Sequence, residues 1–288
     1  MGQYDIALIG GDTRTAFMLS YFMEQNYRVI CYGIEKIPQN DNLAVYAGSL
    51  QEAVEQSSCI VGGIPFIKCG KIFSGQELPD LSIDVLFECM TEGKVIFAGM
   101  LSKEFAETCR NKNIVCHDFM KDEALAIFNS IATAEGTVLE ALLHKETNIH
   151  GSNSLVLGYG RCGTALAEKL KGMGAKVTVC SRCDVELAKA NTAGLNTLPA
   201  DILKDEIHQY EYIYNTIPSV ILTEDILLKI DRDALVIDIA SEPGGIDKAA
   251  AYKLGVKTLH CLGLPGKYAP KISAKGLTDF VVNRLQLR

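Results

Sequence analysis

The sequence predicts an α/β protein built from two doubly wound parallel-sheet domains that a long helix links. Short apolar segments rich in β-branched residues alternate with segments of helical periodicity, and this alternation is typical of parallel sheets covered by helices. It occurs twice, once before and once after a long helical pattern over residues 119–145. A chain of 288 residues is long enough for two such domains.

In the first half, apolar residues recur at helical spacing between Thr13 and Gln25, which predicts a helix. The segment from Pro65 to Ser82 contains glycines and a further proline, so we expect an irregular connection there. Six short apolar segments are predicted as strands: Ile6–Ile9, Arg28–Tyr32, Cys59–Gly62, Val85–Cys89, Val95–Ala98 and Ile114–His117.

The broad apolar stripe over residues 119–145 predicts one long helix that carries the chain from the first domain to the second. A second helix is predicted over Cys162–Met173, and the strands predicted around it are Ser154–Leu157, Lys176–Cys180, Tyr212–Asn215, Leu235–Ile239 and Val256–Leu259. We place the boundary near residue 150, with a flavodoxin-like domain over 1–150 that includes the long helix and a second domain over 151–288. The last helix is expected to pack back on the first domain.

Charge and cysteine spacing exclude several classes of protein. Lysine and arginine number 28 against 35 acidic residues, a net charge of −7, so the basic surface of a nucleic-acid binder is missing. No apolar segment approaches the roughly 20 residues that span a bilayer, and no secretory signal is recognisable, so we expect a cytoplasmic protein. The ten cysteines lie mostly in apolar runs, and the single CxxC, from Cys180 to Cys183, has no second pair. Free thiols and no metal site are therefore expected.

A glycine-rich turn follows the predicted strand Ser154–Leu157 and opens the next predicted helix. The spacing GxGxxG in this context is typical of a Rossmann domain that binds NAD(P). Gly158 permits the tight turn, Gly160 lets a pyrophosphate approach the backbone, and Gly163 allows close packing of helix and strand. Cofactor contacts are expected from the whole turn: Gly158, Tyr159, Gly160, Arg161, Cys162 and Gly163.

The end of the next strand indicates which nucleotide is bound. Domains that bind NAD usually carry Asp or Glu there, to accept hydrogen bonds from the ribose, whereas this chain has Ser181 and Arg182. A hydroxyl and a guanidinium can hold a 2′-phosphate, so we expect NADP(H) in preference to NAD(H), with Arg182 as the main determinant. The alternative is an arginine that only faces solvent.

Two more segments follow predicted strands at the edge where a Rossmann sheet binds its cofactor. Their order along the chain favours cofactor contact, although ordinary turns could explain each one by itself. The residues expected to contact the cofactor there are Asn215, Thr216, Ile217, Pro218, Asp238 and Ala240.

In the first domain, Asp12 and Arg14 follow the predicted strand Ile6–Ile9. Asp12 is expected to cap the next helix and Arg14 to bind a substrate carboxylate bidentately. His117 ends another predicted strand, but no carboxylate relay accompanies it, so a structural histidine is the alternative. No hydrolase motif is present.

Five segments spread along the chain carry a family resemblance: 9–14 (IGGDTR), 129–136 (NSIATAEG), 158–163 (GYGRCG), 238–245 (DIASEPGG) and 263–270 (GLPGKYAP). With these motifs the chain resembles the dipicolinate synthase A-subunit family. The last segment also looks like the Met-Pro-Gly loop of alanine dehydrogenases, with Leu264 in place of methionine.

The resemblance implies oxidation of dihydrodipicolinate to dipicolinate, a diacid of bacterial spores, with NADP as the hydride acceptor. It also implies a second, flavoprotein-like subunit (the B-subunit of the synthase) in the mother cell of a sporulating bacterium, and we expect a homo-oligomer. Arg14, with Asp12 beside it, would bind one carboxylate of the diacid. The substrate cleft would be lined by three residues of the long helix: Asn129, Thr133 and Glu135. The alternative is that these side chains only pack the helix against the rest of the protein.

Proton transfer has no motif of its own in this sequence. His117 and Glu135 are the candidates, but nothing in the chain fixes a general base. Two alternatives therefore stay open: a nucleotide-binding scaffold whose partner performs the chemistry, and an enzyme similar to alanine or hydroxy-acid dehydrogenases.

Overall fold

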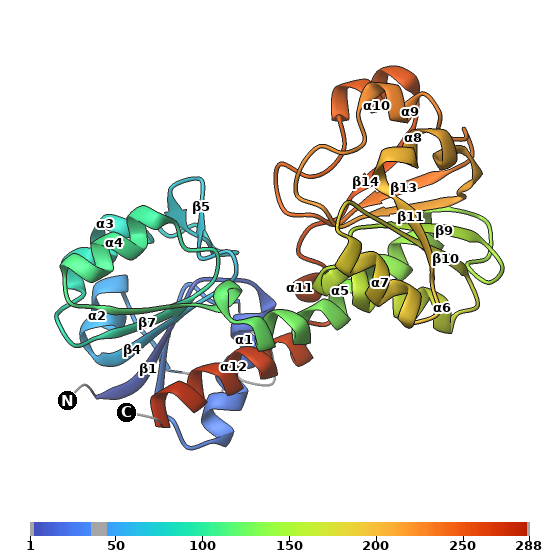
Figure 1. Ribbon diagram of the computed structural model, residues 1–288. Coiled ribbons are helices and arrows are strands. Elements are labelled where there is room, and N and C mark those ends of the chain that lie inside the picture. The colour runs from blue at the N-terminus through green and yellow to red at the C-terminus, as the bar shows by residue number, and fades with distance from the viewer. Residues whose placement is uncertain (1–2, 36–44, 287–288) are drawn as a thin grey trace. The chain divides into compact units, whose positions relative to one another are not determined.

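The computed structural model describes residues 3–35 and 45–286, and the chain divides into two compact units (Figure 1). The first unit holds the chain up to Ala126 and again from Ala269 onward, and the second unit is Ile127–Tyr268. The division lies inside helix α5 (Glu123–His144) and not near residue 150. The physical reason is that α5 serves two cores, because Leu125 packs in the core of the first unit and Ala134 in that of the second.

The first unit is built on a six-stranded parallel sheet in the order β3-β2-β1-β4-β7-β8. Its strands are β1 (Tyr4–Ile9), β2 (Val29–Tyr32), β3 (Val45–Tyr46), β4 (Ser57–Gly62), β7 (Val95–Ala98) and β8 (Val115–Asp118). Its helices are α1 (Thr13–Glu24), α2 (Leu50–Glu55), α3 (Ile83–Cys89), α4 (Lys103–Asn111), the short η1 (Phe119–Lys121) and α12 (Pro270–Gln286). A small antiparallel hairpin, β5 (Ile67–Lys68) and β6 (Lys71–Ile72), stands apart from the sheet.

Helices cover both faces of this sheet, as Figure 1 shows. Side chains alternate along a strand, so β1 contributes to two cores. Ile6 and Leu8 pack with residues of α1 and α12, and Ala7 and Ile9 pack with residues of α2, α3 and α4. The last helix of the chain therefore belongs to the core of the first unit.

One predicted strand is wrong. The segment Val85–Cys89 lies in helix α3, because Ser82 caps that helix with its side chain, which accepts the N–H of Val85. Leu86 and Met90, four residues apart, are buried on one face. The run of apolar residues concealed this helical spacing, since short apolar runs do not distinguish a strand from a buried helix.

The second unit has a six-stranded parallel sheet in the order β11-β10-β9-β12-β13-β14. Its strands are β9 (Asn153–Leu157), β10 (Lys176–Ser181), β11 (Asn196–Pro199), β12 (Tyr212–Asn215), β13 (Leu235–Asp238) and β14 (Lys257–His260). Its helices after α5 are α6 (Arg161–Gly172), α7 (Asp184–Thr192), η2 (Ala200–Ile202), α8 (Leu203–Glu206), η3 (Ile207–Gln209), α9 (Glu224–Leu227), α10 (Lys248–Leu254) and α11 (Leu264–Tyr268). Both units thus have the doubly wound strand order of the Rossmann type, and the predicted fold class is confirmed. The flavodoxin-like prediction for the first domain is wrong, because its sheet has the Rossmann order and not the flavodoxin order 2-1-3-4-5.

The predicted strands other than Val85–Cys89 are confirmed, with ends that differ by two residues at most. All ten cysteines are free thiols. None of the helices in the described part of the chain combines the length and the apolar character needed to cross a bilayer. Within residues 3–35 and 45–286, no three potential ligands from His, Cys, Asp and Glu gather as a metal site would require.

A buried carboxylate fixes helix α11 to helix α5 in the second unit. The side chain of Glu140 on α5 is only 6% exposed, and its Oε1 accepts hydrogen bonds from Lys267 Nζ at 2.7 Å and from Tyr268 Oη at 2.6 Å. The hydrogen bond from Lys267, with that from Tyr268, holds the pKa of Glu140 below its ordinary value. Next to it, Gly136 lets α11 approach closely, because a Cβ there would lie 3.0 Å from the Cβ of Leu264.

We predict that Glu140→Gln lowers the stability of the second unit by about 1–3 kcal/mol at pH 7, because a buried charge-assisted hydrogen bond is lost. The folded-state pKa of Glu140 lies below the unfolded one, so this stabilisation is complete above the ordinary value of 4.5 and is lost as the pH falls through the folded-state pKa. The difference between variant and wild type should therefore narrow below pH 4.5. Thermal unfolding followed by circular dichroism across this range measures it.

Glu135→Gln is the matched control on the same helix. Glu135 is 58% exposed and pairs with Lys169, itself 43% exposed, at 2.8 Å, and exposed pairs of this kind contribute about 0–1 kcal/mol. Equal losses in the two variants would contradict the role assigned to the buried carboxylate.

Candidate functional site

The turn between β9 and α6 owes its shape to two glycines that leave no room for a side chain. Gly158 has a φ of +88°, and a Cβ added to it would lie 2.7 Å from Thr216 Oγ1. A Cβ added to Gly163 would lie 2.2 Å from the carbonyl oxygen of Gly158. Helix α6 can therefore begin immediately beside the end of β9, as the GxGxxG spacing predicts.

Gly160, the middle glycine of the motif, faces open space. No heavy atom lies within 4 Å of a Cβ added there, and its φ of −77° is one that any residue adopts. It is the N-cap of α6, which has no side-chain cap and no acidic residue in its first turn. The positive end of the α6 dipole is thus available to an anion.

Two other residues of this turn are partly enclosed by the protein. Tyr159 is buried, and its backbone N–H donates to Glu186 Oε2 at 3.3 Å. Burial raises the pKa of the Cys162 thiol, so this cysteine stays protonated and is a poor nucleophile. Cys162 packs against the core of the second unit.

At the end of β10, Ser181 and Arg182 lie in very different surroundings. Ser181 is buried; its hydroxyl donates to Glu186 Oε2 at 2.6 Å and accepts the N–H of Cys183 at 3.0 Å. Arg182 is exposed and has no hydrogen bond or ion pair with any residue that the structure describes. Glu186, on α7, was not among the predicted residues, because the usual position of an acid that binds the ribose is the strand end. Its place in the first turn of the following helix was the available signal.

Asn215 and Asp238, at the ends of β12 and β13, form a fully buried network. Asp238 Oδ1 accepts from Asn215 Nδ2 at 2.8 Å and from the N–H of Ala240 at 3.0 Å, and Oδ2 accepts from the N–H of Gly245 at 2.8 Å. The side-chain amide of Asn215 also donates from Nδ2 to the carbonyl of Ile217 and accepts the N–H of Ile217 on Oδ1. These side chains hold the strand-end loops in place, while Thr216 and Ile217 pack against Gly158 and Pro218 is exposed.

The corresponding turn of the first unit is closed. Gly11 and Gly63, after β1 and β4, are so close that a Cβ on Gly63 would lie 2.6 Å from Gly11 Cα. Asp12 caps α1, as the sequence predicts. Buried Arg14 donates from Nε and Nη2 to Asp12, with the shortest distance 2.7 Å, and Nη2 also donates to the carbonyl of Ile64. Arg14 thus ties together the two loops.

The remaining predicted residues do not form a cluster within either unit. In the first unit, the ring of His117 stacks on Phe97 with centroids 4.7 Å apart. In the second, Thr133 Oγ1 donates to the carbonyl of Asn129, and Asn129 Oδ1 is buried without a hydrogen-bond partner. Glu135 pairs with Lys169.

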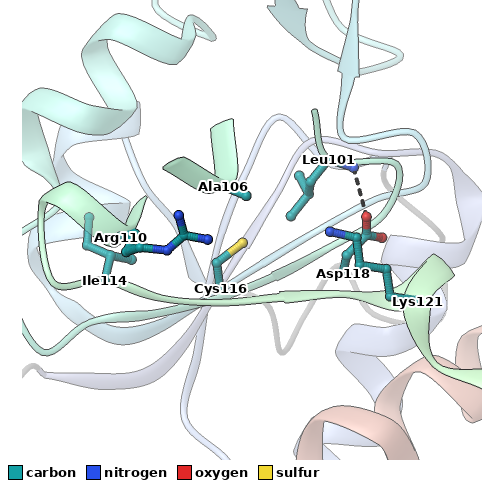
Figure 2. Close-up of a pocket in the computed structure, with 7 residues that line it drawn as sticks. All are labelled: Leu101, Ala106, Arg110, Ile114, Cys116, Asp118 and Lys121. Atoms are coloured by element: carbon teal, nitrogen blue, oxygen red, sulfur yellow. Dashed lines mark hydrogen bonds between the residues drawn. The ribbon is translucent and has the colours of Figure 1, made fainter. Parts of the chain in front are cut away.

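A cavity of about 320 Å³ lies in the first unit (Figure 2). It is lined by Leu101, Ala106, Arg110, Ile114, Cys116, Asp118 and Lys121. None of the predicted site residues lines it, and Asp118 uses its oxygens to accept the N–H groups of Met100 and Leu101, at 3.1 Å each. Since neighbouring residues of a strand point to opposite faces, His117 points away from the side of β8 that carries Cys116.

The comparisons with known proteins decide the family. Residues 5–120 match the family model for the N-terminal domain of the dipicolinate synthase A-subunit. A relative, the dipicolinate synthase A-subunit of Bacillus subtilis (strain 168), is 33% identical over 280 residues, which is 95% of this chain and 93% of that protein. This chain belongs to the dipicolinate synthase A-subunit family. The resemblance found in the sequence motifs is thereby confirmed.

Solved structures agree with this assignment. The crystal structure of the dipicolinate synthase A-subunit from Bacillus halodurans has a TM-score of 0.90 at 28% identity and covers 99% of this chain and 98% of that one. The crystal structure of the Bacillus subtilis protein has a TM-score of 0.87 at 29% identity, over 99% and 97%. A transhydrogenase from Sinorhizobium meliloti has a TM-score of 0.69 at 15% identity, over 98% and 95%. The last similarity shows a shared fold only.

The glycine geometry predicts different effects on stability for two alanine variants. Gly163→Ala should destabilise the second unit by about 1–3 kcal/mol, because α6 must move away from the Gly158 carbonyl. Gly160→Ala should leave the melting temperature unchanged or slightly higher, because the added methyl group meets no neighbour and the backbone φ is ordinary. Thermal unfolding of both variants measures the difference, and equal melting temperatures would refute this explanation of the turn.

Proposed function

We propose that this protein is the oxidoreductase subunit that converts dihydrodipicolinate to dipicolinate, with NADP as the hydride acceptor. The observation that carries the proposal is the open, uncapped N-terminus of α6 beside Gly160, in a chain that belongs to the dipicolinate synthase A-subunit family. The same family membership supports a partner, the second subunit of the synthase. We further propose a homo-oligomer in the cytoplasm of a sporulating mother cell.

The residues of the second unit fit a dinucleotide. The pyrophosphate would lie over Gly160, where the backbone is uncovered, and would accept hydrogen bonds from the first N–H groups of α6. Thr216 and Ile217, which pack on Gly158, would border the nicotinamide half, and their loop is held by the buried pair Asn215 and Asp238. These two buried residues position the loop, since their polar atoms already have partners in the protein.

The preference for NADP rests on Arg182. Its guanidinium has no partner in the described part of the chain, so it can donate to a 2′-phosphate without breaking an existing ion pair. Ser181 is not equivalent, because its hydroxyl proton is already donated to Glu186.

The chemistry requires little covalent help from the protein. Dihydrodipicolinate would lose a hydride to a bound oxidised nicotinamide and a proton to a base, and would thereby become an aromatic pyridine. Arg14 keeps Nη1 outside its contacts with Asp12 and Ile64, and Asn129 keeps an unpartnered Oδ1. Of these two atoms, Nη1 of Arg14 is the group that we propose for a carboxylate of the substrate. Asp12 would orient Arg14, while Thr133 and Glu135 have partners on or beside α5.

A second candidate function is a nucleotide-binding scaffold whose partner performs the chemistry. The observation that favours it is the lack of a group placed for proton transfer among the predicted residues. His117 stacks on Phe97, and Glu135 is held by an exposed lysine.

Turnover distinguishes the two functions. We expect NADPH to form when the purified chain is mixed with NADP and freshly prepared dihydrodipicolinate, at a rate that the second subunit of the family increases or leaves unchanged. Absorbance of NADPH is the measurement. If the second subunit is active by itself and this chain forms no NADPH in any combination, the oxidoreductase proposal is refuted and the scaffold is favoured.

Nucleotide binding should depend on Gly160. We predict that Gly160→Ala weakens NADPH binding roughly tenfold or more, since a methyl group over the turn keeps the pyrophosphate from backbone donors that contribute about 1–3 kcal/mol. Titration of NADPH fluorescence gives the affinity, and an unchanged melting temperature shows that the fold is intact. Wild-type affinity in this variant would place the pyrophosphate elsewhere.

A further inference from the structure

Glu186 joins two parts of the molecule that border the expected adenosine half of a dinucleotide. Its Oε2 accepts the N–H of Tyr159, inside the glycine turn, and the hydroxyl of Ser181, at the end of β10. In Rossmann domains the adenosine ribose lies between these two places, where an acid at the strand end accepts hydrogen bonds from the ribose hydroxyls. This chain lacks that strand-end acid, but α7 delivers a carboxylate to the same place from the following helix.

The carboxylate of Glu186 also determines whether the hydroxyl of Ser181 can donate a hydrogen bond to a ligand. The hydroxyl proton of Ser181 goes to Glu186 at 2.6 Å, and its oxygen accepts the N–H of Cys183 at 3.0 Å. Ser181 therefore has no proton to donate to a phosphate while Glu186 keeps this position. The cation next to it in the chain is Arg182, which lies on the exposed side of the turn.

We propose that Glu186 is the residue that reads the adenosine ribose. Its carboxylate accepts a hydrogen bond from the 2′-hydroxyl of NAD(H) and repels the 2′-phosphate of NADP(H), so that it opposes Arg182. The nucleotide preference of the site is the difference between these two effects. The inference rests on the proposed nucleotide site and adds a determinant of its specificity.

The opposition follows from charge and from the place of Ser181, which precedes Arg182 in the chain and is bonded to Glu186. A 2′-phosphate held at the strand end by Arg182 would therefore be a neighbour of this carboxylate. Two anionic groups in such proximity repel each other. A ribose hydroxyl carries no charge and can donate a proton, so the same carboxylate attracts it.

The test is the ratio of the dissociation constants of NADH and NADPH, measured by fluorescence titration on the full chain. We expect Glu186→Gln to shift this ratio about tenfold or more toward NADPH, because the repulsion is removed while the side-chain shape is kept. Arg182→Ala should shift it by a similar factor toward NADH. Arg182→Ala should melt at the wild-type temperature because Arg182 is exposed. The melting temperature of Glu186→Gln is measured beside it, because this half-buried side chain accepts hydrogen bonds from Tyr159 and Ser181, and the ratio of the two affinities is compared under conditions where the variant is folded.

Two control variants separate this role from general electrostatics and from loop capping. Asp184→Asn removes the same charge from the first turn of the same helix, at an exposed position outside the Ser181 contact, and should shift the ratio less than about twofold because solvent and salt screen it. Ser181→Ala should also leave NADPH binding within about twofold, since its proton is not available to the phosphate.

Three results would overturn the inference. They are an equal change in both affinities in Glu186→Gln, a shift in Asp184→Asn as large as that in Glu186→Gln, and a selective loss of NADPH binding in Ser181→Ala. If the wild-type chain binds neither nucleotide, the proposed function fails and the inference fails with it. If it binds both and Glu186→Gln does not change their ratio, the inference alone fails.

Discussion

The contact between Gly163 and the carbonyl of Gly158 is the constraint on which the second unit depends. With no side chain between them, helix α6 starts directly after the end of β9, and its N-terminus has no side-chain cap. The three glycines of the motif therefore have two different roles. The outer two remove steric barriers inside the protein, and Gly160 leaves an uncovered surface outside it. An acidic protein with a net charge of −7 can hold an anion only through such local features.

The first unit shows that the fold alone does not provide this site. Its strand order, β3-β2-β1-β4-β7-β8, matches that of the second unit position by position. At the equivalent turn, however, Gly11 and Gly63 press against each other, and Arg14 ties the two loops through Asp12 and Ile64. The glycines of this turn let two loops of the first unit pack against each other, whereas Gly160 of the second unit leaves room for a ligand. Loop chemistry on a common scaffold decides which unit binds what.

Hydrophobic pattern and glycine spacing were enough to predict the fold class, most strands and the close packing of helix and strand at the glycine turn. The predictions from the sequence were wrong or incomplete where the three-dimensional position of a residue decides its structure or its role. An apolar run concealed the helical face of Leu86 and Met90, and short edge strands such as Val45–Tyr46 carry too few residues for a pattern. Glu186 reaches the end of β10 from a helix, so the residues of the strand end itself give no indication of it. The boundary inside α5 was hidden because one helix packs into two cores.

Nucleotide should bind at the open turn of the second unit and not at the closed turn of the first. Hydrogen–deuterium exchange of the full chain, with and without saturating NADPH, distinguishes the two turns in one experiment. We expect slower exchange in peptides that cover residues 158–163 and 181–186. Slower exchange in peptides that cover residues 10–15 and 62–64, with none in 158–163, would contradict this assignment.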